Sequence, residues 1–227
     1  MQKVAYTKKV QALLSPAERR VFAKLNGPQK IQNYLDHLPI NFELAGETLM
    51  SPRRVIREKM AHCIEAALFA AAALAYHGSP PLLLDLQTKA EDEDHVVTLF
   101  SVKDESTSGG KLWGAISKTN HMILRWRDPV YKTVRELAMS YMHEYYMADG
   151  KKTLLAYSRP FDLRQYKPAT WVVAEPNLEW VAEDLDVSQH FPIASKKVLA
   201  TLRRASPIER AASEMVEWNK TGTRRRF

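Results

Sequence analysis

The chain has 227 residues, of which 45% are hydrophobic and 26% are charged, a composition typical of a compact globular protein rather than a disordered one. Its single cysteine excludes an internal disulfide, and no apolar run reaches the roughly 18 residues of a membrane-spanning helix. The first residues lack the apolar stretch of a signal peptide, so we expect a cytoplasmic protein with no membrane partner. The formal net charge of +7 is scattered along the chain, apart from a basic cluster in the last residues.

The first third of the sequence predicts helices. Ser15-Pro16 and Ser51-Pro52 each combine a capping residue with proline at the first helical position. Between them, residues 29–39 carry apolar side chains at helical spacing and end at a proline. We expect these short helices to pack around a larger element.

That larger element is predicted to begin near Cys63. After Glu65 the segment is apolar on every side until Gly78, which indicates a helix buried all round. Strands are predicted next, separated by an acidic loop at 89–94 and a turn at 104–110; their β-branched and apolar content is high. The predicted strands are 82–87, 95–102 and 111–118. The middle of the chain thus predicts one buried helix packed on an antiparallel sheet.

The second half of the chain predicts a long helix over 130–149, begun by Asp128 and Pro129 and ended by a glycine. Short strands and loops should follow over 153–185, and a last helix should run from Ser206 to about residue 219. The fold class expected is therefore α+β, with additional helices at both ends. We expect a single domain over 1–220, with its core at about 51–150, followed by a flexible basic tail at 221–227.

Cys63 and His95 are the candidate catalytic pair. Cys63 falls at the amino end of the buried helix, where unpaired backbone N–H groups and the helix dipole favour a thiolate. His95 begins the strand after the acidic loop, at a position that can face the helix end across a cleft. Such a pair can share a proton and form the activated nucleophile of acyl transfer. A lone cysteine among alanines is also compatible with a purely structural role.

The order of these elements resembles the core of the transglutaminase-like superfamily, which uses a papain-like Cys–His–Asp arrangement. The matching pieces are "CIEAALFAAAALAYHGSPPLLLDLQ", "DHVVTLF" and "GKLWGAISKTN", within residues 60–120. The longer pattern, with "GAISKTNH" and "RDPVYKTVRELAMSYMHEYY", is similar to a widespread family of bacterial proteins described as transglutaminase-like. The resemblance implies a papain/transglutaminase-like core with Cys63 as nucleophile and His95 as its base. It implies no particular substrate.

One position departs from the superfamily pattern. Tryptophan and three further residues should precede the aspartate that orients the histidine, but here Trp113 leads to Ser117. A serine hydroxyl can accept the imidazole N–H, yet it carries no charge to stabilise imidazolium. Asn120 is the first substitute that we consider, because papain-type sites orient their histidine with asparagine, and Ser117 comes next. Asp128 is a third candidate, although we expect it to cap a helix.

Neighbouring polar residues receive more ordinary interpretations. His62 adjoins the thiol, but neighbours on a helix diverge, so we expect a surface or first-turn role. Glu65 should bond a backbone or basic partner rather than substrate. His121 can line the cleft, and Asp94 in the acidic run can favour a cationic substrate. No histidine or cysteine pair has zinc-motif spacing and no glycine-rich phosphate loop occurs, so we expect no metal and no cofactor.

Two functions follow. The first is a cysteine hydrolase, a peptidase or amidase, in which Cys63 attacks a peptide or amide carbonyl with His95 as base and Asn120 or Ser117 as orienting group. Transfer to an amine is less favoured than hydrolysis because it needs a site that excludes water. The alternative is a catalytically decayed binding or adaptor protein for an acidic partner, nucleic acid included, bound through the basic tail at 221–227.

Overall fold

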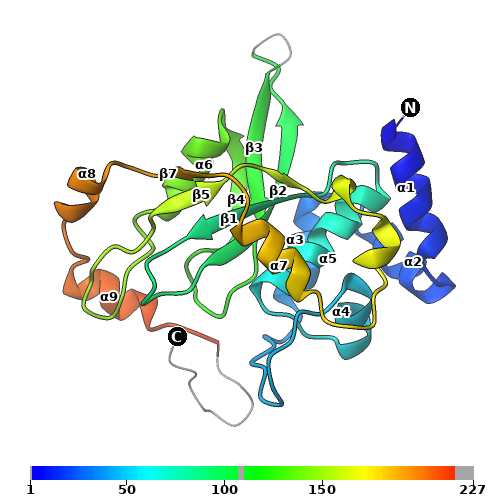
Figure 1. The fold of residues 1–227 in the computed structure, drawn as a ribbon, viewed down its shortest axis with the longest axis horizontal. Coiled ribbons are helices and arrows are strands. Elements are labelled where there is room, and N and C mark those ends of the chain that lie inside the picture. The colour runs from blue at the N-terminus through cyan, green and yellow to red at the C-terminus, as the bar shows by residue number, and fades with distance from the viewer. Residues whose placement is uncertain (1, 107–109, 218–227) are drawn as a thin grey trace.

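The structure is a computed structural model that describes residues 2–106 and 110–217. It is an α+β fold in which a mostly antiparallel sheet is flanked by helices (Figure 1). The helices are α1 (Gln2–Leu13), α2 (Pro16–Lys24), α3 (Pro28–Asp36), α4 (Pro52–Glu58), α5 (Cys63–Tyr76), α6 (Val134–Tyr141), α7 (Glu179–Asp186), α8 (Lys196–Ala200) and α9 (Pro207–Ser213), with 3₁₀ turns η1 (Leu163–Gln165) and η2 (Pro168–Thr170).

The sheet has the strand order β4-β3-β2-β1-β5-β7, with β6 also pairing β1, and these strands pair antiparallel. The strands are β1 (Leu82–Gln87), β2 (His95–Lys103), β3 (Lys111–Ile116), β4 (Arg127–Tyr131), β5 (Ala156–Ser158), β6 (Phe161–Asp162) and β7 (His190–Pro192). The three central strands and their antiparallel pairing confirm the prediction for the middle of the chain.

The predicted buried helix is confirmed as α5, which begins at Cys63 itself. Its residues from Ala66 to Ala75 are almost entirely buried, because alanine lets the sheet and the N-terminal helices approach closely on all sides. One apolar cluster joins α5 and helices α2 to α4 to one face of the sheet. A second cluster lies between the other face and α6, around Leu84, Val97 and Tyr141. Figure 1 shows α1 to α5 gathered on one side of the sheet.

The predicted long helix over 130–149 is wrong. Residues Arg127–Tyr131 form β4 instead, and Pro129 is tolerated there because β4 is an edge strand with partners on one side only. Helix α6 starts later, where Thr133 and Glu136 form a reciprocal capping box, and it ends at Tyr141. Asp128 therefore caps no helix; its Oδ1 accepts a hydrogen bond from Trp126 Nε1 at 2.9 Å.

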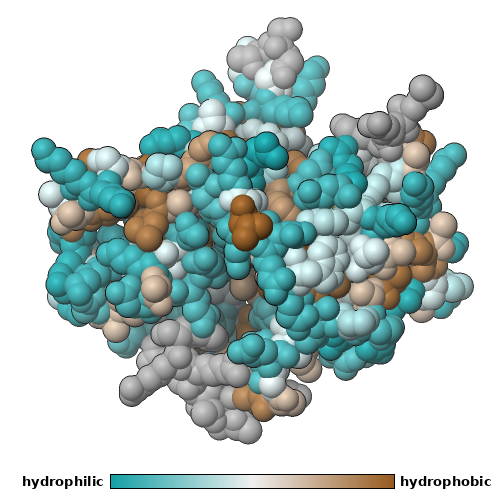
Figure 2. All heavy atoms as spheres, viewed as in Figure 1, coloured by the Kyte–Doolittle hydropathy of each residue, from teal (hydrophilic) through white to brown (hydrophobic). Residues whose placement is uncertain are grey.

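The C-terminal part contains more regular structure than the sequence indicates. The segment expected to hold strands and loops also contains α7, and β7 and α8 follow it. The last helix, α9, stops at Ser213, well short of residue 219. The tail at 221–227 lies outside the described residues. Among the described residues, no helix is long and apolar enough to cross a membrane, and the face in Figure 2 is mostly hydrophilic with scattered hydrophobic residues.

Candidate active site

Cys63 is the first residue of α5, and His62 is the N-cap. The backbone of His62 is extended, with φ −94° and ψ −170°, and the first helical bond runs from Ala66 N to His62 O at 3.0 Å. An α-helix leaves its leading N–H groups without intrahelical partners, and its dipole favours negative charge there. The sulfur of Cys63 therefore lies at the positive end of a fourteen-residue helix.

The side chain of His62 turns toward the thiol. Its Nε2 lies 2.9 Å from the Thr48 carbonyl oxygen and 3.3 Å from Glu65 Oε1, both of which only accept, so Nε2 carries a hydrogen. Burial opposes the charged form, but hydrogen bonds to Cys63 and Glu65 raise the pKa of His62 to about 11. Of the surface or first-turn role expected for His62, the structure shows the first-turn one, and because the residue is an extended N-cap its ring also reaches the thiol.

Glu65 is a fully buried carboxylate beneath this pair. It accepts hydrogen bonds from the backbone N–H groups of His62 (3.0 Å) and Met50 (2.9 Å) and from the Thr48 hydroxyl (2.8 Å). Burial raises the pKa of Glu65, yet the contacts with His62 and these donors lower it to about 2. The expected structural role of Glu65 is confirmed; it is also the counterion of His62.

His95 stands on the other side of the sulfur, at the start of β2. Its Nε2 lies 2.7 Å from Ser117 Oγ, and Ser117 Oγ donates its only hydrogen to the Leu124 carbonyl oxygen at 2.7 Å. The hydroxyl must therefore accept from the ring, which fixes the Nε2–H tautomer of His95. Nδ1 is then the nitrogen left to hydrogen-bond the thiol of Cys63. A neutral serine thus orients the ring as an aspartate would, without adding a charge.

The backbone around Ser117 is held from two directions. Leu124, which receives the serine hydrogen, has φ +60°, a left-handed conformation that costs a non-glycine residue roughly 1–2 kcal/mol. Its N–H donates to Glu144 Oε2 at 2.9 Å, which holds the strained turn in place. From α3, Gln32 accepts from Ser117 N at 3.0 Å and donates to Ser117 O at 2.8 Å. The N-terminal helices therefore position the orienting serine, a role that the sequence did not reveal.

Lys118 adds a third support. It is almost fully buried, and its Nζ donates to the carbonyl oxygens of Leu35 (2.8 Å) and Leu38 (2.6 Å), at the C-terminal end of α3. Burial lowers the pKa of Lys118 to about 8. A cation is favourable at a helix C-terminus, so this contact anchors the segment after β3 to α3.

The combined effect on Cys63 is strong. Burial raises its thiol pKa, but the hydrogen bonds from His62 and His95 and their positive charge lower it to about 5. The residue is partly exposed, so the sulfur remains open to a reactant. Cys63 is thus a thiolate at neutral pH, with an imidazole on either side.

Asn120, the first substitute considered for the missing aspartate, occupies a different place. It lines the cleft beside Cys63, and its backbone oxygen accepts from Glu217 N at 2.7 Å. Ser117 Oγ, and not Asn120, lies within hydrogen-bond distance of His95 Nε2, so the geometry favours Ser117 over Asn120 as the orienting group. The hairpin register could have indicated this: Thr98 pairs with Ile116, so His95 and Ser117 are diagonal neighbours on one face.

The cleft that reaches Cys63 and His95 has a volume of about 430 Å³. Loops before α4, before β2 and after β3 line it, together with the start of α7. His121 and Asp94, both expected near the cleft, are among its lining residues. Cys63 and His95 are therefore in contact with a space large enough for a small molecule.

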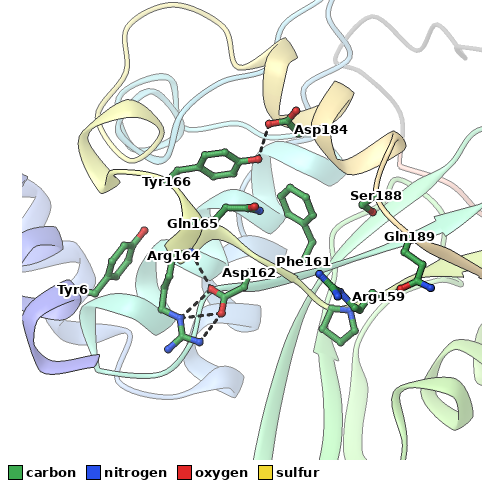
Figure 3. A pocket seen from close by; sticks show the side chains of 11 residues that line it. Tyr6, Arg159, Phe161, Asp162, Arg164, Gln165, Tyr166, Asp184, Ser188 and Gln189 are labelled. Atoms are coloured by element: carbon green, nitrogen blue, oxygen red, sulfur yellow. Dashed lines mark hydrogen bonds and ion pairs between the residues drawn. The ribbon is translucent and has the colours of Figure 1, made fainter. Parts of the chain in front are cut away.

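A larger cavity of about 920 Å³ lies between α1, η1 and α7 (Figure 3). Its polar groups largely pair with one another: Arg164 with Asp162, and Tyr166 with Asp184. Ser188 also lines it, but the nearby His190 directs Nδ1 to the Ser188 carbonyl and Nε2 to Asp85 rather than to the hydroxyl. Among the described residues that line this cavity, none is an activated nucleophile, so the smaller cleft with Cys63 is the candidate active site.

Among the described residues, no group of three or more His, Cys, Asp or Glu side chains could hold a metal ion. Compared with models of known protein families, the chain matches none. A search of curated proteins found no match either. The interpretation of the site therefore depends on its own geometry.

Proposed function

We propose that the protein is a cysteine hydrolase, a peptidase or amidase, built on a papain/transglutaminase-like core. The observation that carries the proposal is the 2.7 Å contact between His95 Nε2 and Ser117 Oγ, with the serine hydrogen committed to Leu124. This contact leaves Nδ1 of His95 to act on Cys63. The order of α5, β1, β2 and β3, and the antiparallel pairing of the strands, also fit the resemblance to the transglutaminase-like superfamily.

In the first half of the reaction, the Cys63 thiolate, whose proton His95 holds at Nδ1, attacks the carbonyl carbon of an amide. Backbone N–H groups at the start of α5 stabilise the oxyanion. The tetrahedral intermediate collapses to a thioester as the C–N bond breaks, and His95 returns the proton to the leaving amine. Ser117 keeps the ring in register while it is charged.

In the second half, His95 Nδ1 removes a proton from water, and the resulting hydroxide attacks the thioester carbon. The C–S bond breaks and a carboxylic acid leaves, which regenerates the Cys63 thiolate beside the protonated His95. Water is the favoured acceptor because Cys63 is partly exposed in an open cleft, whereas transfer to an amine needs water to be excluded.

The alternative, a decayed binding protein, predicts an apolar side chain filling the cleft and a histidine detached from the thiol. The cleft is instead open and lined largely by polar residues, and His95 hydrogen-bonds Cys63. The Ser117 hydroxyl accepts a hydrogen bond from His95 and donates one to the Leu124 carbonyl oxygen. This full pairing favours a working orienting group over a position that has merely lost its aspartate. These observations support the enzyme.

The test is acyl-enzyme formation with p-nitrophenyl acetate, an activated ester that needs no specific recognition. We expect a burst of nitrophenolate and addition of one acetyl group to Cys63, detected by peptide mass spectrometry. His95→Gln should slow the burst by about 10²-fold or more, as loss of a general base does. His143→Gln, the same change at an exposed histidine that does not line the cleft, is the matched control and should leave the burst unchanged. Acetylation spread over lysines, or a burst unaffected by His95→Gln, would refute the proposal.

A further inference from the structure

The cleft around Cys63 is acidic although the chain as a whole is basic. Its lining includes carboxylates from the loop before α4, the loop before β2 and the first residue of α7. These carboxylates belong to Glu43, Glu47, Asp92, Glu93, Asp94 and Glu179. Among the described residues that line the cleft there is no lysine or arginine, while the chain carries a net charge of +7. The cleft around Cys63 is therefore negatively charged in a chain whose net charge is positive.

Two of these carboxylates are held by neutral donors, which leave their charge in place. Asp92 accepts from the Thr153 hydroxyl at 2.5 Å, and Asp94 accepts from the Thr88 N–H at 2.6 Å. The threonine contacts also fix where the charges lie.

The nearest positive charge is already balanced. His62 Nε2 lies 3.3 Å from Glu65 Oε1 and 3.7 Å from Glu43 Oε1, and Glu65 is buried below the cleft rather than among its lining residues. A concave site lined by one sign of charge focuses its field and raises the local concentration of counterions. A molecule that binds in this cleft lies next to Cys63. The negative potential of the cleft should therefore make Cys63 react faster with cations than with anions.

We propose that Cys63 acts on an acyl donor that carries a positive charge close to its reactive carbonyl, as a peptide with a lysine or arginine side chain does. The substrate class rests on the proposed hydrolase function, but the charge preference can be measured on the thiol alone. A failure of catalysis and a failure of the charge preference are therefore distinguishable.

The first experiment compares two methanethiosulfonate reagents on the full-length protein, one with a trimethylammonium group and one with a sulfonate group. Both transfer a thioalkyl group to the thiolate and release methanesulfinate. The measured quantity is the ratio of the cationic to the anionic reaction rate. At low ionic strength, we expect this ratio for Cys63 to exceed the ratio for a small free thiol by at least about tenfold. The preference should shrink as salt screens the carboxylates.

Charge-reversed variants locate the source of the field. Glu47→Lys/Glu179→Lys changes two exposed residues of the cleft and should lower the cation-to-anion rate ratio by about tenfold. The matched control, Glu105→Lys/Glu183→Lys, makes the same change in net charge at exposed positions that do not line the cleft, and it should keep the wild-type ratio. Unfolding midpoints of both variants establish that they fold. An equal fall in both variants, or a wild-type ratio equal to that of the free thiol, overturns the proposal.

The second experiment extends the preference to substrate. Matched fluorogenic peptides carry lysine, glutamine or glutamate next to the cleaved amide, and we expect kcat/KM to fall in that order. Cleavage of all three at equal rates would overturn the charge preference while leaving the hydrolase intact. If the thiol prefers the cationic reagent but no peptide or ester is turned over, the hydrolase fails and the charge preference stands.

Discussion

Replacing His62 by glutamine should raise the pKa of the Cys63 thiol while leaving the fold in place. Glutamine keeps an N–H that can reach the Thr48 carbonyl, which His62 Nε2 contacts at 2.9 Å, but it removes the positive charge beside the sulfur. His95 remains to hydrogen-bond the thiol. The substitution therefore isolates the part of the thiolate stabilisation that the N-cap residue provides.

The magnitude follows from the pKa of Cys63, which the site lowers from an ordinary 9.0 to about 5. At 1.36 kcal/mol per pKa unit, this is a preference for the thiolate of about 5 kcal/mol, shared between two imidazoles and opposed by burial. Losing one imidazole should remove about half of it and bring the thiol pKa to about 7. At pH 6 the thiolate fraction would then fall from about nine-tenths to about one-tenth.

The assay is the rate of iodoacetamide alkylation of Cys63 between pH 4 and 10, read by mass spectrometry. We expect an apparent pKa near 5 in the wild type and near 7 in His62→Gln, with alkylation at pH 6 slower by about tenfold. His143→Gln should titrate like the wild type. A His62→Gln thiol that still titrates near 5 would show that His62 does not hold the charge, and a wild-type thiol titrating near 8.5 would refute the electrostatic description of the site.

Three further outcomes are expected. Ser117→Asp should lower esterase activity rather than restore a stronger triad, because a carboxylate cannot donate to the Leu124 carbonyl as the hydroxyl does; faster turnover in this variant would contradict the geometry. Gln32→Ala removes two hydrogen bonds to the Ser117 backbone and should cost about 1–3 kcal/mol in urea unfolding and lower kcat more than it changes KM. Burial raises the pKa of Asp85 from 3.8 to about 6 despite its contact with His190, so the folded state binds this proton more tightly and loses stability as the pH rises from about 4 through 6. The unfolding free energy of Asp85→Asn relative to wild type should therefore increase by about 2–3 kcal/mol between pH 4 and 7; a difference independent of pH would count against it.

Part of the candidate site could be predicted from local sequence alone. An alanine-rich run without a polar face has to be buried, so the sequence determined that α5 is central and that Cys63 lies at its start. The β-branched segment after the acidic loop likewise determined β2, with His95 as its first residue. Because these features depend on residues within one or two turns of chain, periodicity and capping signals were sufficient to find them.

The local sequence predicts a wrong helix start where two possible helix starts lie close together in the chain. Asp128 and Pro129 have the residue types of a helix start, as do Thr133 and Glu136 a few positions later. Pairing of β4 with β3 decided between them, since a strand added to the sheet edge satisfies backbone groups that an isolated helical turn would leave to water. Only the tertiary structure contains that partner.

The sequence by itself determined that Cys63 begins the buried helix, that His95 begins the strand after the acidic loop, and that a serine stands at position 117 where the resemblance implies an aspartate. Only the tertiary structure decided that Ser117 contacts His95, through the hairpin register and the strained turn at Leu124, and that His62 faces the thiol, through an extended N-cap. The physical reason is the distance along the chain between the residues that interact. A helix or strand is set by neighbours along the chain, whereas the direction of a hydroxyl or an imidazole is set by partners that packing brings from distant segments, such as Gln32, 85 residues away from Ser117.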